Sequence, residues 1–162
     1  MRQVAGLALA TALLAAPAVA EDWEVLGRGS VTMGREVQRM WIADHPDQGP
    51  QARLEGSGSA AVLSFEAVPP PTGEPYMPKP SLQVTVADPL GTPKLDTVHY
   101  RDEDGVNYVA KSGTVEAHLT EGRWIVVFST ELKELDPTTW EPAAGGSDLR
   151  VRGSFNVQPV LM

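Results

Sequence analysis

Three histidines are the residues of this 162-residue chain best suited to acid–base or metal chemistry: His45, His99 and His118. Their spacing excludes the His-x-x-x-His pair with which a helix presents two imidazoles to one metal ion. His99 and His118 fall in two segments that we expect to be adjacent hairpins, where they project from the less apolar faces. A metal-dependent module or small enzyme around these two histidines, with Asp102 and Glu116 nearby, is therefore one alternative function. Ordinary exposed or half-buried strand histidines are the commoner interpretation.

A second group of candidate ligands is the acidic segment Asp102-Glu103-Asp104-Gly105. Clustered carboxylates beside a glycine can surround a hard cation such as Ca²⁺. An EF-hand loop needs an acid at the position of Tyr100 and a glutamate at the position of Lys111, so that type of site is excluded. A looser calcium loop and a solvated hairpin turn are both compatible with the segment, and the turn is the commoner structure.

Nucleophilic and cofactor motifs are missing from the sequence. The chain contains no cysteine, which excludes disulfides, thiol catalysis, Cys-ligated zinc and iron–sulfur clusters. No Gly-x-Ser-x-Gly or Ser-x-x-Lys motif is present either. We therefore expect no catalytic residue and no cofactor, and we interpret the protein as one that acts by binding, as an accessory or structural partner.

Residues 1–20 have the layout of a secretory signal peptide. Arg2 precedes an uncharged run, Val4 to Ala16, and the triplet Ala18-Val19-Ala20 provides an A-x-A cleavage site. We expect a mature protein that begins at Glu21 and is soluble in the periplasm, with full secretion as the alternative. Because the chain lacks cysteine, the lipid anchor of a bacterial lipoprotein is not expected, and no later segment has the length of a membrane-spanning helix.

Charge limits the partners expected for the mature chain. The chain has 13 Lys and Arg against 21 Asp and Glu, and residues 1–20 contain one Arg and no acid, so their removal leaves a net charge of −9. Nucleic acids and anionic lipids are polyanions that need a clustered basic face. The sequence contains no such cluster, so neither is expected as a partner.

Most of the mature chain alternates apolar and polar residues with a period of two, which is typical of half-buried strands. The clearest hairpin covers residues 114–132, where the two-residue turn Glu121-Gly122 fixes the register. Three apolar pairs then share one face: Leu119 with Trp124, Ala117 with Val126, and Val115 with Phe128. A second hairpin covers residues 97–110. A three-residue loop that ends at a left-handed Gly105 pairs Tyr100 with Tyr108 there, and we prefer it because a two-residue turn would mix the two faces.

Further strands are expected at residues 61–66, 81–86 and 149–157. In the last of these Gly153 occupies an inward position, which marks a bulge or a close approach of another group to the backbone. The segment Arg35 to Ala43 fits a strand or a helix, and we favour the strand because its neighbours are β and its flanks suit turns. The sequence therefore predicts a single all-β domain over residues 21–162, an antiparallel β-sandwich or flattened barrel of roughly eight to nine strands. Trp23, Trp41 and Trp124 are assigned to its core.

Two long loops interrupt the strands, a proline-rich one at residues 69–80 and a second at 136–148. They carry Tyr76 with Met77 and Trp140, respectively. Aromatic rings on loops of a rigid domain are common anchors for protein or glycan partners, so these three residues are the predicted partner-binding residues. The alternative is that the rings fold back to cover a sheet edge. A carbohydrate-binding module is a further alternative, which requires two coplanar exposed rings.

Three segments in the C-terminal half carry a family resemblance: Ser112-Gly113-Thr114-Val115, Val127-Phe128-Ser129 and the closing strand Arg152-Gly153-Ser154-Phe155-Asn156-Val157. This layout resembles an uncharacterised family of small secreted bacterial β-rich lipoproteins. The chain departs from that family in lacking the lipidated cysteine and in having Trp124 in a strand that usually contains glycine. The resemblance implies a β fold and no particular activity.

Overall fold

The computed structural model describes residues 24–45, 48–70 and 80–162. The predicted signal peptide, Trp23 and the predicted partner-binding residues Tyr76 and Met77 lie outside these residues.

Strands dominate the described residues, and the one helix among them is a single 3-10 turn. This confirms the all-β prediction, and it also confirms that the ambiguous segment after Arg35 is a strand. The elements in chain order are β1 (Glu24–Met33), β2 (Glu36–His45), β3 (Gly49–Pro50), β4 (Ala52–Glu55), η1 (Gly58–Ala60), β5 (Val62–Ala67), β6 (Ser81–Ala87), β7 (Lys94–Arg101), β8 (Asn107–Ala110), β9 (Thr114–Thr120), β10 (Arg123–Glu134), β11 (Asp148–Val157) and β12 (Val160–Leu161).

The strands form a single sheet in the order β12-β4-β5-β6-β7-β8-β10-β11-β1-β2-β3, with β9 as an additional partner of β10. The sheet is mixed, because β12 runs parallel to β4 whereas the other pairs are antiparallel. It is not closed into a barrel. The described residues hold twelve strands rather than the expected eight or nine, since two-residue strands such as β3 and β12 are too short for alternation to reveal them.

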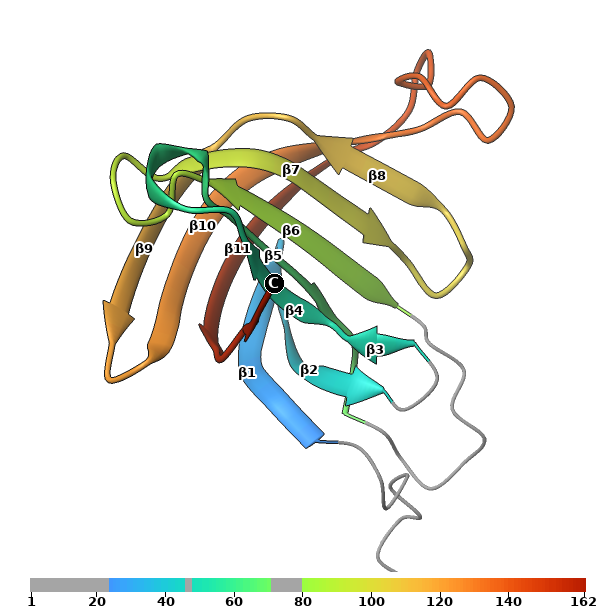
Figure 1. The fold of residues 1–162 in the computed structure, drawn as a ribbon. Coiled ribbons are helices and arrows are strands. Elements are labelled where there is room, and N and C mark those ends of the chain that lie inside the picture. Colours follow the sequence, from blue (N-terminus) through green and yellow to red (C-terminus); the bar gives the residue numbers. More distant parts are fainter. Residues whose placement is uncertain (1–23, 46–47, 71–79) are drawn as a thin grey trace, which may run out of the picture.

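The sheet folds over, so that its two halves face each other across one apolar core (Figure 1). Phe65 on β5 and Phe155 on β11 meet in this core with ring centroids 5.0 Å apart, although their strands are not neighbours in the sheet. At one side the halves also touch through the backbone. Trp41 N donates to Val68 O at 2.6 Å, and Val68 N donates to Trp41 O at 2.9 Å.

Both predicted hairpins have the predicted register. In β9 and β10 the three apolar pairs are the predicted ones, and in β7 and β8 Tyr100 lies opposite Tyr108. Gly105 has φ +82°, the left-handed conformation expected at the end of the three-residue loop. The apolar face of this hairpin is not buried along its whole length, because Leu119 lies at the end of an edge strand and is 51% exposed.

The tryptophans separate according to the face of the strand on which they lie. Trp124 is buried in the core at 2% exposure, as predicted. The core assignment of Trp41 is wrong, because Met40 and Ile42 take the inward positions of β2 and leave Trp41 half-buried on the outer face. There the Arg28 guanidinium lies 5.1 Å from the centre of its ring, a cation–π contact.

Candidate functional site

The loop from Leu135 to Ser147, between β10 and β11, carries the one predicted partner-binding residue that the structure describes. It projects from the upper end of the sheet (Figure 1). Backbone hydrogen bonds within and across the loop give it a defined shape: Trp140 N donates to Asp136 O at 2.9 Å, Asp136 N to Glu141 O at 2.8 Å, and Ala143 N to Glu134 O at 2.9 Å.

Two carboxylates brace this loop. Asp136 Oδ1 accepts from the backbone N–H groups of Thr138 at 2.8 Å and Thr139 at 3.0 Å. These bonds favour the charged form and hold the pKa of Asp136 below its ordinary value. Glu134 Oε2 accepts from Ser147 N at 3.0 Å and ties the far end of the loop to β10.

Trp140 stands out on this loop in both its backbone and its exposure. Its φ is +59°, a left-handed conformation that is uncommon for any residue other than glycine and costs energy in a bulky one. Its side chain is 62% exposed, so burial of the ring does not repay that cost. The ring therefore does not serve as the cover of a sheet edge, which was the alternative interpretation.

The two histidines of the alternative function have separate partners. His99 Nε2 lies 3.0 Å from Asn107 Oδ1, on the hairpin of β7 and β8. His118 Nε2 lies 4.0 Å from Glu116 Oε2, and this pair on β9 is largely exposed. In the part of the chain that the structure describes, no group of three His, Asp or Glu side chains is arranged to hold a metal ion.

The acidic segment after Tyr100 forms a hairpin loop whose first carboxylate is used within the loop. Asp102 Oδ1 accepts from the N–H groups of Asp104 and Val106, both at 2.9 Å. A cavity of about 570 Å³ lies beside this loop, between it and the turn that joins β1 to β2. Tyr100 lines the cavity and is buried, and this burial, followed by the negative charges of Asp102 and Glu103, raises the pKa of its hydroxyl to about 12.

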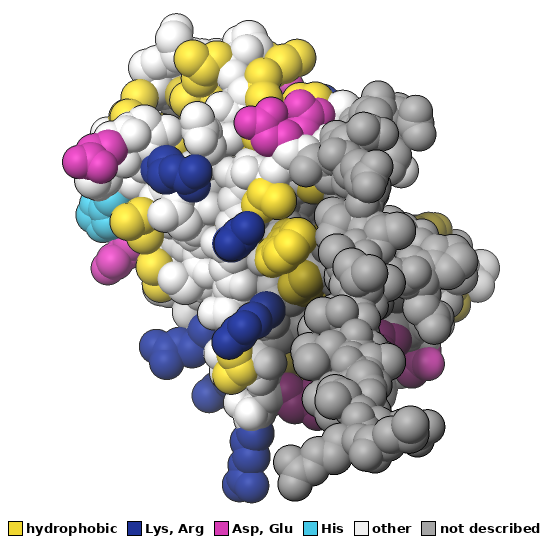
Figure 2. Space-filling model, turned by 90° about the horizontal axis from the view of Figure 1, so that it is seen from below, with side chains coloured by type: hydrophobic (Ala, Val, Ile, Leu, Met, Phe, Trp, Pro, Cys, Tyr) yellow, Lys and Arg dark blue, Asp and Glu magenta, His cyan; other side chains and the backbone are white. Residues whose placement is uncertain are grey.

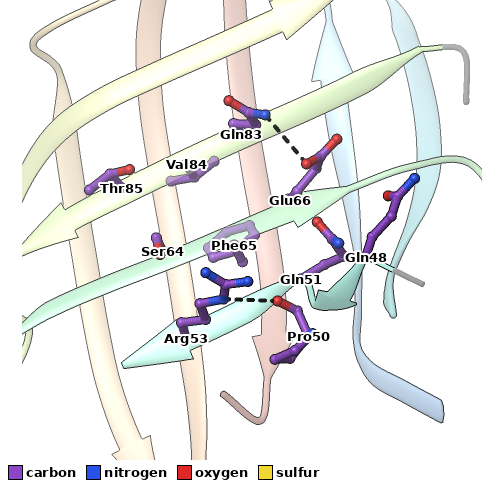
Figure 3. Close-up of a pocket in the computed structure, with 10 residues that line it drawn as sticks. All are labelled: Gln48, Pro50, Gln51, Arg53, Ser64, Phe65, Glu66, Gln83, Val84 and Thr85. Atoms are coloured by element: carbon purple, nitrogen blue, oxygen red, sulfur yellow. Dashed lines mark hydrogen bonds between the residues drawn. The ribbon is translucent and has the colours of Figure 1, made fainter. Parts of the chain in front are cut away.

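A polar groove of about 310 Å³ crosses β4, β5 and β6 on the outer face of the sheet (Figure 3). Arg53 Nε donates to Pro50 O at 3.2 Å along one wall, and Gln83 Nε2 donates to Glu66 Oε2 at 3.3 Å along the other. Amides, hydroxyls and charged groups here can exchange hydrogen bonds with a polar ligand. Among the described residues that line the groove, none offers an exposed aromatic ring on which a sugar could stack, because Phe65 points into the core with 3% exposure.

This groove was not predicted from the sequence, since its polar residues are the outward members of three strands and become neighbours only when those strands pair. A helix long and apolar enough to cross a membrane is not found in the described residues. Comparison with protein-family models, curated proteins and solved structures gives no match for this chain. The resemblance to a family of β-rich lipoproteins therefore stays a prediction.

Proposed function

We propose that this is an exported, non-catalytic binding protein, whose loop from Leu135 to Ser147 presents Trp140 to a protein or glycan partner outside the cytoplasm. The location outside the cytoplasm follows from the signal peptide expected at residues 1–20. What carries the binding role is a single observation: Trp140 is 62% exposed and has a left-handed backbone that its loop holds in place by hydrogen bonds.

The conformation of Trp140 supports a role outside the domain. A residue held in a sparsely populated backbone region persists only where its surroundings impose it, and such residues concentrate at binding and catalytic sites. Glycine would fit φ +59° without strain, yet the position carries the largest side chain. Tryptophan rings are also enriched among the few residues that dominate binding energy at interfaces. A preformed loop lowers the entropy lost on binding.

Two substitutions on this loop, at Trp140 and at Thr138, separate binding from folding. Trp140→Gly removes the ring and relieves the backbone, so we expect an unchanged or higher thermal midpoint and loss of the partner from affinity capture out of periplasmic extract. Thr138→Ala, on the same loop, keeps the Thr138 N–H that bonds to Asp136 and serves as the control that retains the partner. A marked fall in the thermal midpoint of Trp140→Gly, or full retention of the partner, would contradict the proposal.

A further inference from the structure

The outer face of the second half of the sheet gathers arginines that are scattered in the sequence. We use the name arginine face for the outward side chains of β10, β11, β1 and β2 between residues 123–129, 152–156, 28–32 and 37–41. Its charged members come from four different strands: Arg123 on β10, Arg152 on β11, Arg28 on β1 and Arg39 on β2.

Strand register brings these four side chains to one surface. Arg28 pairs with Asn156 on one side and with Trp41 on the other, and the next outward residue of β1, Ser30, pairs with Arg39. Arg152 pairs with Thr32 of β1. Because neighbouring strands lie about 4.8 Å apart, the four arginines span roughly 15 Å across the sheet.

Acidic side chains are missing from the outward positions of this face. Its other members are polar or apolar: Ser30, Thr32, Val37, Trp41, Ile125, Val127, Ser129, Ser154 and Asn156. The four arginines are exposed, and none has a carboxylate within 4.0 Å among residues 24–45, 48–70 and 80–162. The face is bordered by Glu116 on β9 and by Glu131 on β10, which is ion-paired with Arg150 at 3.8 Å.

This arrangement overturns the expectation that the chain has no clustered basic face. The sequence hid the cluster because its members are far apart along the chain and become neighbours only through strand pairing. The net charge of −9 for the mature chain is a sum over all its charged residues and does not show where the basic residues gather. Figure 2, which views the molecule from below, shows dark-blue Lys and Arg side chains that follow one another across the surface with hydrophobic side chains among them.

The apolar members of the face indicate which polyanion it meets. Ile125 is 41% exposed and lies beside Arg123 and opposite Asn156. Val127 is 42% exposed, follows Ile125 on the same face of β10 and lies opposite Ser154. Arginine and tryptophan would suit a nucleic acid or an acidic polysaccharide equally well, but exposed aliphatic side chains gain nothing from a hydrated polymer. At a bilayer interface, in contrast, apolar contact and attraction to anionic headgroups add to each other.

From these observations we infer that the arginine face is a peripheral docking surface for an anionic phospholipid bilayer. The guanidinium groups would contact lipid phosphates, and Trp41, Ile125 and Val127 would lie at the headgroup level. The face is the outer side of a folded sheet and can rest on an extended surface (Figure 1). A hollow of about 280 Å³ between Arg28, Arg123 and Asn156 could receive one phosphate headgroup of that surface. The acidic remainder of the protein would be repelled by the same bilayer and would orient the molecule.

The test is co-sedimentation of the protein with vesicles of phosphatidylglycerol mixed with phosphatidylcholine, and with vesicles of phosphatidylcholine alone. We expect binding only to the anionic vesicles, with release when NaCl is raised to about 1 M, where the screening length falls to ~3 Å. Equal binding to both kinds of vesicle, or binding that survives high salt, would overturn the inference.

Charge-matched double variants identify the surface. Arg39→Gln with Arg152→Gln removes two charges from the arginine face, and each charge near an anionic surface changes partitioning by roughly fivefold, so we expect about 25-fold weaker binding. Lys94→Gln with Arg101→Gln removes two charges from β7, in the other half of the sheet, and should change binding little. Any contribution of the N-terminal residues to vesicle binding is the same in all variants, so it does not affect this comparison.

Three results would count against the docking surface. Equal losses in the two double variants would show that net charge alone controls binding. Wild-type binding by the Arg39 and Arg152 variant would show that other residues make the contact. The third result is that duplex DNA or an acidic polysaccharide binds the protein tightly and displaces it from anionic vesicles. That result would show that the polymer, and not the lipid, is the partner of this face. The inference does not depend on Trp140, so a Trp140→Gly variant should bind vesicles normally.

Discussion

The aromatic ring of Phe128 occupies the space in which a side chain on Gly153 would lie. The two residues face each other on the paired strands β10 and β11, and the pairing continues on both sides of them without a shift in register. Of the two reasons anticipated for an inward glycine, a close approach is therefore the correct one and a bulge is not. Phe128 in turn stacks near Phe155, with ring centroids 6.4 Å apart.

Substitution of Gly153 by alanine should destabilise the domain, because its Cβ would overlap the Phe128 ring in the middle of the core. Overpacking of this kind costs about 1–3 kcal/mol in the free energy of unfolding. Urea denaturation of Gly153→Ala measures the cost, and Ser154→Ala on the outward side of β11 is the matched control with little expected change. Equal stability of the two variants would contradict the described packing.

The exposure of Leu119 predicts that this residue of β9 contributes less to the stability of the domain than Leu132 of the paired strand β10. Leu132 on β10 is fully buried, and its replacement by alanine should lower the free energy of unfolding by about 2–5 kcal/mol. Leu119→Ala should cost less than about 1 kcal/mol, since half of that side chain is already in contact with water. Similar losses in the two variants would show that the end of β9 is buried in solution.

Tyr100 gives the domain a defined response to alkaline pH. Its pKa is about 12 in the folded protein against 10.0 ordinarily, so the unfolded chain loses this proton first. The contribution to stability is complete below pH 10 and is lost as the pH rises towards 12. Urea denaturation as a function of pH should therefore show falling stability in that interval, and Tyr100→Phe should reduce the slope. An identical slope in the variant would mean that the hydroxyl of Tyr100 ionises normally.

The loop that carries Trp140 should become less ordered when Asp136 is protonated at low pH. Because the folded state lowers the pKa of this carboxyl, its stabilising effect is present above the ordinary value of 3.8 and is lost as the pH falls through the folded value. We expect hydrogen exchange at the amides of Thr138 and Thr139 to be slow at neutral pH and faster in Asp136→Ala. Exchange rates that do not change in this variant would contradict the two hydrogen bonds to Asp136 Oδ1.

Local features of the structure could be predicted well where a turn fixed the register. The turn Glu121-Gly122 and the left-handed Gly105 each determine which residues face each other, and the two hairpins follow from them. Alternation also identified the inward residues of β6 and β11. The order of the strands could not be predicted, because pairs such as β10 with β8 and β1 with β11 join distant segments that no turn links.

The surface features depend on that unpredicted order. The core position predicted for Trp41 is wrong, because Met40 and Ile42 are the inward residues of β2 and Trp41, between them, lies on the outer face. The arginine face and the polar groove are likewise composed of outward residues from several strands. Trp140 was found as a candidate from its loop and its aromatic character alone, but its left-handed backbone has no signature in the sequence.

The most direct test of the proposed binding role is photo-cross-linking in the cell. A photoreactive phenylalanine analogue is placed at Glu141, the exposed neighbour of an intact Trp140, in one variant and at Glu121, which is exposed on a distant turn, in another. We predict a discrete cross-linked product with a protein or glycan of the cell envelope from position 141 and none of the same size from position 121. The same products from both positions, or none from position 141, would contradict the role assigned to the loop.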